Sequence, residues 1–238
     1  MRSFRDTLYL PSERRLASPA LARRLHTIGQ RLQRGLDLQQ RFFGFTTRAP
    51  AIADDGLACA AMAADAVVAK LNEQIAHEFA AHQQYVACAV HYDAQTLPQL
   101  ARFFYRQALE ERDHALMMVR YLLDADAPVV VPGVDAPQVE FADIVEPVAL
   151  ALAQEKRVAD QINAIAAAAR GESDFTSEQF VQWFIKEQVE EIATMSDLLR
   201  VVERSRDDPM EIENYMAREH PGTASDDPTA PSPAGAGA

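Results

Sequence analysis

The chain has 238 residues, 48% of them hydrophobic, and a formal net charge of −12. This length allows one large domain or two small ones, and the composition is ordinary for a soluble globular protein. No apolar run approaches the length of a membrane span, so we expect no membrane partner. The two cysteines, Cys59 and Cys88, fit neither a metal-ligand spacing nor a disulfide framework, and we therefore expect a reducing compartment, the cytoplasm.

The balance of charged residues differs between the N-terminal quarter of the chain and the rest. Residues 1–61 contain ten arginines, no lysine and five acidic residues, and their periodicity is weak. Residues 62–238 contain thirteen basic and thirty acidic residues, a formal net charge of −17. Binding of nucleic acid by this second part is not expected, because phosphate contacts need positive charge. Its field would attract cations instead.

Helical periodicity occupies most of the region after residue 61. Pro98 suits the first turn of a helix, and Gly171 suits a position just beyond a helix end. Asp208 before Pro209 is a plausible N-cap for a short helix. The pattern predicts four long helices and a short fifth one, at residues 65–93, 97–124, 147–170, 176–206 and 208–220.

The connections between these helices predict the topology. Short links join helices one and two, and helices three and four, which makes each pair antiparallel neighbours. The stretch "DADAPVVVPGVDAPQVEFADIVE" between helices two and three is long and Pro-rich. We expect an all-α fold, the ferritin-like four-helix bundle with one long crossover between helices two and three and a short fifth C-terminal helix, covering residues 62–220. The tail "PGTASDDPTAPSPAGAGA", residues 221–238, is expected to be disordered.

Each core-facing stripe of the four long helices contains a glutamate near its middle. The four are Glu78 (with His82 and Tyr85 on the same stripe), Glu111, Glu155 and Glu191. One such residue alone would be assigned to an edge position facing water. Four together indicate a shared positive charge, because an unpaired buried carboxylate is costly. No lysine or arginine lies in these stripes, so the pattern favours a metal cluster.

The residue types narrow the choice of metal. The four glutamates offer hard oxygen donors, His114 offers one imidazole, and no thiolate is present. Such a set suits iron, manganese or zinc better than copper(I), and it disfavours a structural zinc site. Glu111 and His114 are three residues apart on one helix face, so both can bind one ion. Tyr85 could donate a hydrogen bond or an electron at this site, or it could be a core aromatic residue.

Four segments carry a resemblance to a known family. The segments "NEQIAHEFAAHQQYVACAVHYD", "LPQLARFFYRQALEERDHALMMVRYLL", "LALAQEKRV" and "EQFVQWFIKEQVEEIATMSDLLRVV" resemble a prokaryotic non-haem ferritin of the mycobacterial and actinobacterial type. The resemblance covers residues 71–219. It implies a 24-subunit hollow shell that oxidises Fe(II) with dioxygen at a di-iron ferroxidase centre in each bundle and stores the ferric mineral in its cavity.

The resemblance also implies a ligand set. One iron would be bound by Glu78, Glu111 and His114. A second would be bound by Glu155 and by Glu111, which would bridge the two ions. Glu191 would lie nearby, with Gln188 in the second position of "EQVEE". A third iron site beside this pair would use Glu110, Glu187 and Glu190, for which a solvated acidic helix face is the alternative. Tyr85 and Trp183 match family aromatics near the centre. Asp174 and Glu178 could line a pore, or could simply be acids favoured by the helix dipole.

Two departures bear on cofactor and class. The last bundle helix has Gln188 and Glu191 where many di-iron oxidases have a second Glu-x-x-His, and Arg112 occupies the place of the haem-binding methionine of bacterioferritins. No haem is therefore expected. The alternatives to storage are a ferritin-like di-iron oxidase or peroxidase, a DNA-protecting mini-ferritin and a structural helical assembly. The missing second histidine argues against the oxidase or peroxidase, and the ligand set within one subunit argues against the mini-ferritin. A structural assembly would not need four central glutamates.

The first 61 residues match nothing in the family. They could be a targeting peptide, an extension outside the shell, or the result of start-site choice with Met62 as the true beginning. The last is favoured, because "MAADAVVAKLNEQI" begins where family sequences begin. The tail could also dock a partner.

Overall fold

The computed structural model describes residues 63–221 and 227–236, which belong to one compact unit, Leu57–Ala238. The expectations for residues 1–61 lie outside the described residues. So do those for residues 222–226 and 237–238 of the tail.

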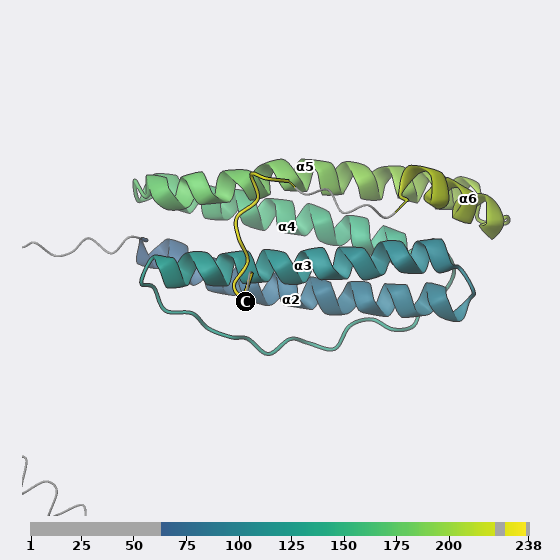
Figure 1. Cartoon of the computed structure of the whole chain (residues 1–238), viewed down its shortest axis with the longest axis horizontal. Helices are drawn as coiled ribbons and strands as arrows, with labels where there is room; N and C mark the ends of the chain where they lie inside the picture. The colour runs from purple at the N-terminus through teal and green to yellow at the C-terminus, as the bar shows by residue number, and fades with distance from the viewer. Residues whose placement is uncertain (1–62, 222–226, 237–238) are drawn as a thin grey trace, which may run out of the picture. The chain divides into compact units, whose positions relative to one another are not determined.

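The described residues form five helices and no strand (Figure 1). The helices are α2 (Asp65–Ala94), α3 (Pro98–Asp124), α4 (Glu146–Gly171), α5 (Phe175–Arg204) and α6 (Pro209–Glu219). The predicted all-α fold is confirmed, and each predicted end lies within about two residues of the observed one. No described helix is long and apolar enough to cross a membrane.

Local chemistry accounts for where several helices begin. Asp174 accepts a hydrogen bond from the backbone N–H of Ser177 at 3.0 Å, which caps α5. Asp143 does the same for α4, accepting from Val145 at 2.9 Å and Glu146 at 3.0 Å. These carboxylates satisfy N–H groups that have no partner inside the helix, and they favour the positive end of its dipole.

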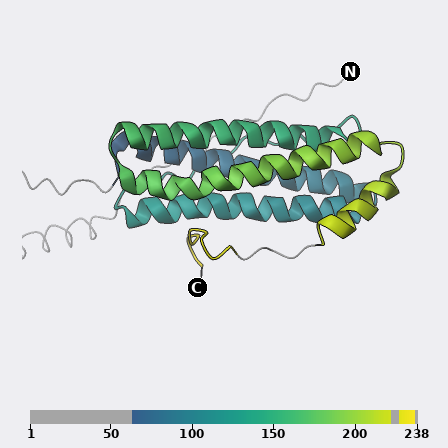
Figure 2. The same ribbon diagram turned by 90° about the horizontal axis from the view of Figure 1, so that it is seen from above.

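The short links make α2 and α3 one antiparallel pair and α4 and α5 another, and the two pairs pack into a bundle (Figures 1 and 2). The crossover between α3 and α4 runs along α2 and is fixed to it at three heights. Asn72 bonds the backbone of Val130 at 2.7 Å, Gln84 bonds that of Gln138 at 2.9 Å, and the Tyr92 hydroxyl donates to the Ile144 carbonyl at 2.7 Å. These polar side chains let an extended segment without strand partners satisfy its backbone.

The bundle interior has two apolar clusters. One contains Tyr92, Leu100 and Phe104, and the other contains Leu71 and Ile75, all fully buried. Each such side chain stabilises the fold by about 1.5–3 kcal/mol relative to an exposed position. On every long helix the buried glutamate of the central stripe separates residues of one cluster from residues of the other, so the clusters enclose a polar layer.

The fifth helix is fixed by a buried carboxylate. Glu213 of α6 accepts hydrogen bonds from the backbone N–H groups of Gln99 at 2.8 Å and Leu100 at 3.0 Å, in the first turn of α3. The Glu213 side chain therefore caps the N-terminus of α3 and holds α6 against the end of the bundle.

Part of the tail expected to be disordered has a defined place. Residues 227–236 lie outside the face formed by α3 and α5, as both views show (Figures 1 and 2). The Ala234 N–H donates to the Leu116 carbonyl at 3.0 Å, and Trp183 donates to Asp227 at 3.1 Å. Composition alone does not reveal these contacts, because they need a preformed helical face.

Candidate metal centre

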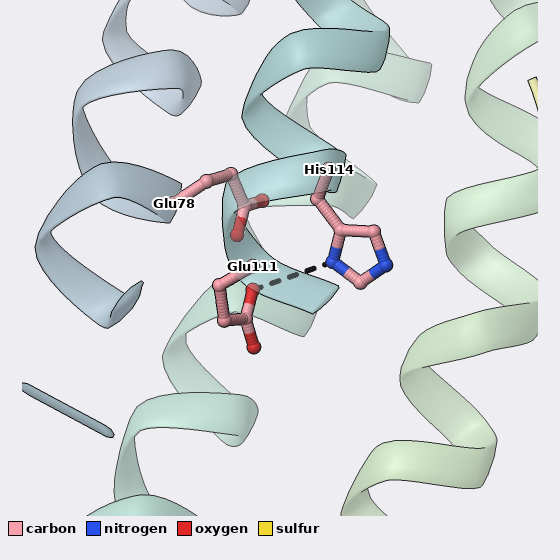
Figure 3. A group of neighbouring side chains, drawn as sticks. All are labelled: Glu78, Glu111 and His114. Carbon is pink, nitrogen blue, oxygen red and sulfur yellow. Dashed lines mark hydrogen bonds and ion pairs between the residues drawn. The ribbon is translucent and has the colours of Figure 1, made fainter. Parts of the chain in front are cut away.

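Three side chains from α2 and α3 converge at the middle of the bundle (Figure 3). Glu78, Glu111 and His114 each offer a ligand atom, and these atoms all lie within 4.8 Å of one another. The exposed fractions of the three residues are 1%, 1% and 3%. Nδ1 of His114 lies 3.3 Å from Oε2 of Glu111, one helical turn away, while its other ring nitrogen points away from both carboxylates. The spacing expected from the sequence is therefore present in space.

Helix α4 adds a fourth carboxylate to this layer. Glu155 is fully buried, and its Oε1 accepts a short hydrogen bond from the Tyr85 hydroxyl. Its Oε2 lies 3.4 Å from the Gln188 amide nitrogen of α5. Tyr85 is itself buried between Glu155 and Phe104, so it is both a core aromatic residue and a donor to the site.

Helix α5 adds Glu191, which is 6% exposed. Gln107 of α3 connects it to the surface, because its amide nitrogen lies 3.2 Å from Glu191 Oε1 and 2.5 Å from Glu110 Oε2. One buried amide therefore touches both the inner carboxylate layer and the acidic side chains outside it. Gln107 lies on the α3 stripe, but spacing gave no reason to assign it a role.

Burial and mutual repulsion raise the pKa values of Glu111, Glu155 and Glu191. Desolvation is the largest cause for Glu111, followed by the charges of Glu155 and Glu78, and the pKa is well above its usual range. Desolvation also raises the pKa of Glu155 to about 7, although the Tyr85 hydrogen bond lowers it. Glu191 is raised by desolvation and then by Glu155. Without a cation, burial therefore favours the protonated forms of Glu111 and Glu191 at neutral pH.

Two buried oxygen atoms in the layer have no hydrogen-bond partner. They are Oε2 of Glu78 and Oε1 of Gln188. Buried polar atoms are normally paired, so an orphan needs a specific explanation. A divalent cation among four carboxylates and one imidazole would satisfy free oxygen atoms and offset the repulsion. The donor set, hard oxygens with one nitrogen, fits iron.

The residues expected to form a third site lie beside this layer on the α3–α5 face. We call Glu110, Glu187 and Glu190 the outer acidic cluster. Glu110 and Glu190 are exposed, and Glu187 is half-buried, with its pKa raised first by desolvation. All three line a cavity of about 320 Å³ that reaches His114. The cavity also contains one cation, Lys186, 3.6 Å from Glu190.

Three other residues named from the sequence have local partners. Asp174 caps α5, and Glu178 pairs with Arg170 at 2.5 Å, so both engage groups of their own helix junction. His82, placed on the core-facing stripe of α2, is only partly buried. Its ring nitrogen lies 2.6 Å from the Ala108 carbonyl, which makes it a packing partner of α3.

Glu78 has a hydrogen-bond partner that was not predicted from the sequence. The Gln74 amide nitrogen donates to Oε1 of Glu78 at 2.9 Å, and Gln74 is 1% exposed. Its spacing of four residues before Glu78 is the signal that could have identified it, since such residues share a helix face. Each of Glu78, Glu155 and Glu191 thus contacts one glutamine amide.

A four-helix bundle with a buried layer of four glutamates and one histidine defines a class, the ferritin-like carboxylate metal proteins. Comparisons with known proteins agree. Residues 68–205 match the family model "Ferritin: Ferritin-like domain". The chain is 52% identical over 151 residues to "Ferritin BfrB" of Mycobacterium tuberculosis, covering 63% of this chain and 83% of that protein. It is 50% identical over 167 residues to "Ferritin BfrB" of Mycolicibacterium smegmatis, covering 70% and 92%. The chain belongs to the ferritin family.

More distant matches agree on the fold. A "Bacterial non-heme ferritin" of Staphylococcus epidermidis is 34% identical over 142 residues, covering 60% of this chain and 86% of that protein. The structure of an open-pore ferritin from Archaeoglobus fulgidus superposes with a TM-score of 0.64 at 24% identity, covering 66% of this chain and 98% of the archaeal one.

Proposed function

We propose that this protein is a ferroxidase that detoxifies and stores iron. The observation that carries the proposal is the buried convergence of Glu78, Glu111 and His114 within 4.8 Å, beside Glu155. Family membership supports iron as the metal. The substrates would be Fe(II) and dioxygen.

The side chains divide into roles. Glu78, Glu111 and His114 would bind one Fe(II), and Glu111 would also bridge to a second Fe(II) held by Glu155, near Glu191 and Gln188. The two Fe(II) would each give up one electron, these two electrons with two protons would reduce dioxygen to hydrogen peroxide, and the anionic ligands would favour the ferric product. An amide at Gln188 binds metal more weakly than an imidazole, which helps the product leave for storage. Tyr85 holds the Glu155 carboxylate in place through its hydroxyl.

The outer acidic cluster would form a weaker third iron site between the inner pair and the mineral. It is supported by the shared cavity with His114 and by the Gln107 amide, which touches both Glu191 and Glu110. No haem is expected, because Arg112, which pairs with Asp113, stands where bacterioferritins have their haem-binding methionine.

We further propose that 24 copies form a shell around the mineral and that it resides in the cytoplasm. A shell of 24 chains of 26.3 kDa has a mass of about 630 kDa. A di-iron oxidase or peroxidase without storage is the second candidate. Aerobic iron loading followed by size-exclusion chromatography with iron analysis separates the two, because only storage gives an iron-filled particle of that size.

Alanine at Glu111 or His114 tests the site itself. Either change removes one of three ligands, so the initial rate of aerobic Fe(II) oxidation should fall at least about tenfold. The matched control is Glu73→Ala, which removes an exposed glutamate of α2. All variants should assemble like the parent, since these side chains lie inside one bundle. Parental oxidation rates in both ligand variants would refute the assignment.

A further inference from the structure

The chain contains one tryptophan, and it stands beside the proposed metal ligands. The Trp183 ring lies edge-on to the His114 imidazole, with centroids 5.6 Å apart and an interplanar angle of 72°. It also packs against Phe184 at 4.9 Å. Trp183 is partly buried with residues 227–236 in place, and these residues cover part of its ring.

The tail provides that cover. The Trp183 indole N–H donates to Oδ2 of Asp227 at 3.1 Å, and Lys186 lies 3.6 Å from the same oxygen. The other oxygen of Asp227 accepts from the backbone N–H and the hydroxyl of Thr229, at 2.8 and 2.6 Å. These bonds lower the pKa of Asp227 to about 2, so it is charged at neutral pH.

A second anchor lies further along the tail. The Ala234 N–H donates to the Leu116 carbonyl of α3 at 3.0 Å, and Ala230 packs against the apolar cluster beneath. The segment 227–236 is thus fixed to α5 at one point and to α3 at another, and it crosses the gap between them.

The cavity that reaches His114 lies under this crossing. Asp227 and Ala230 line its outer side, Trp183 and His114 its inner part, and Glu187 and Glu190 are among its acidic walls. A volume of about 320 Å³ is far more than a single water needs, so the cavity can admit a hydrated divalent ion. Asp227 also contacts the only lysine of the cavity lining, which keeps the cavity attractive to cations.

We propose that Asp227 is a positioning residue for the metal centre. Asp227 holds Trp183 against His114. It thereby keeps residues 227–236 in place as one wall of the passage between the outer acidic cluster and the inner ligands. The choice of ion rests on the proposed function, whereas the position of Trp183 does not. Loss of the hydrogen bond between Trp183 and the Asp227 carboxylate should raise about tenfold the population of molecules in which residues 227–236 are detached from α5.

Fluorescence of the single tryptophan tests this in the metal-free full-length protein. Asp227→Ala should shift the emission of Trp183 to longer wavelength and raise its quenching by acrylamide, because the indole loses its acceptor and its cover. Asp227→Asn keeps an oxygen acceptor and should restore the parental spectrum. Ala234→Pro removes the donor at the second anchor and should give the same shift as Asp227→Ala. The control is Asp160→Ala, an exposed aspartate of α4.

Stopped-flow mixing with Co(II) follows the passage directly, since we expect a paramagnetic ion bound to His114 to quench Trp183, whose ring centroid lies 5.6 Å from that of the imidazole. The rate constant of quenching should rise in Ala234→Pro relative to the parent, and in Asp227→Ala relative to Asp227→Asn, because the Asn variant loses the same charge but keeps an acceptor for Trp183. It should stay parental in Asp160→Ala. Parental emission and rates in both anchor variants would overturn the proposal. Equal changes in the Asn and Ala variants would also overturn it, because charge rather than the hydrogen bond would then be responsible. If the metal centre itself is wrongly assigned, Co(II) will not quench the parent, while the emission shifts will remain.

Discussion

The buried carboxylates should make the metal-free protein less stable as pH rises from 5 to 8. The pKa of Glu155 is raised from 4.5 to about 7, so its folded form holds a proton more tightly than its unfolded form. The stability from this difference is fully present below pH 4.5 and is lost as pH rises through 7. At 1.36 kcal/mol per unit, the loss is on the order of 3 kcal/mol per subunit. Glu111 and Glu191 shift in the same direction.

Guanidinium unfolding of the metal-free assembly at pH 5, 6, 7 and 8 measures this loss. The matched variant is Glu155→Gln, which stays neutral throughout and should therefore lose the part of the slope that Glu155 contributes, while Glu111 and Glu191 keep theirs. The carboxyls whose pKa values are lowered, such as Asp143 and Asp174, titrate below this window and leave it undisturbed.

Zn(II), which does not change oxidation state, should reverse the trend, because bound metal requires deprotonated carboxylates. A parent that is equally stable or more stable at pH 8 without metal, with the same slope in Glu155→Gln, would refute the reasoning. The carboxylates would then have partners other than a metal ion.

Three further predictions concern neighbouring features. Alanine at all three positions of the outer acidic cluster should leave the first burst of Fe(II) oxidation intact and change the amount of iron consumed per dioxygen in later turnovers. An unchanged amount of iron per dioxygen would favour a solvated acidic face instead. So would an iron-soaked crystal that shows only water at this cluster. Tyr85→Phe removes a bond that lowers the pKa of Glu155, so the pH midpoint of Co(II) binding should move upward; an unmoved midpoint would contradict this. Glu213→Leu leaves two backbone N–H groups of α3 without their acceptor and should cost about 1–3 kcal/mol in guanidinium unfolding, whereas exposed Glu219→Leu should cost little.

Local signals in the sequence were enough to predict the helices and their order. Apolar residues at helical spacing, Pro98 in a first turn and Asp208 as a cap are local signals, and they predicted α3 and α6 closely. The glutamates of the four stripes were also readable, because residues three and four apart share a face whatever the partner helix is. The limit of that rule appears at His82, which shares the stripe of Glu78 but lies at its margin, only partly buried.

The pairs of side chains that meet across the bundle could not be predicted from these local signals. Tyr85 and Glu155 are 70 residues apart, Gln99 and Glu213 are 114 apart, and Trp183 and Asp227 are 44 apart. Periodicity fixes which face a residue occupies but not the height or rotation of the facing helix. Those follow from packing of the two apolar clusters around the polar layer. The tail shows the same limit, because a Pro- and Ala-rich segment becomes ordered only where α3 and α5 together present Trp183 and the Leu116 carbonyl.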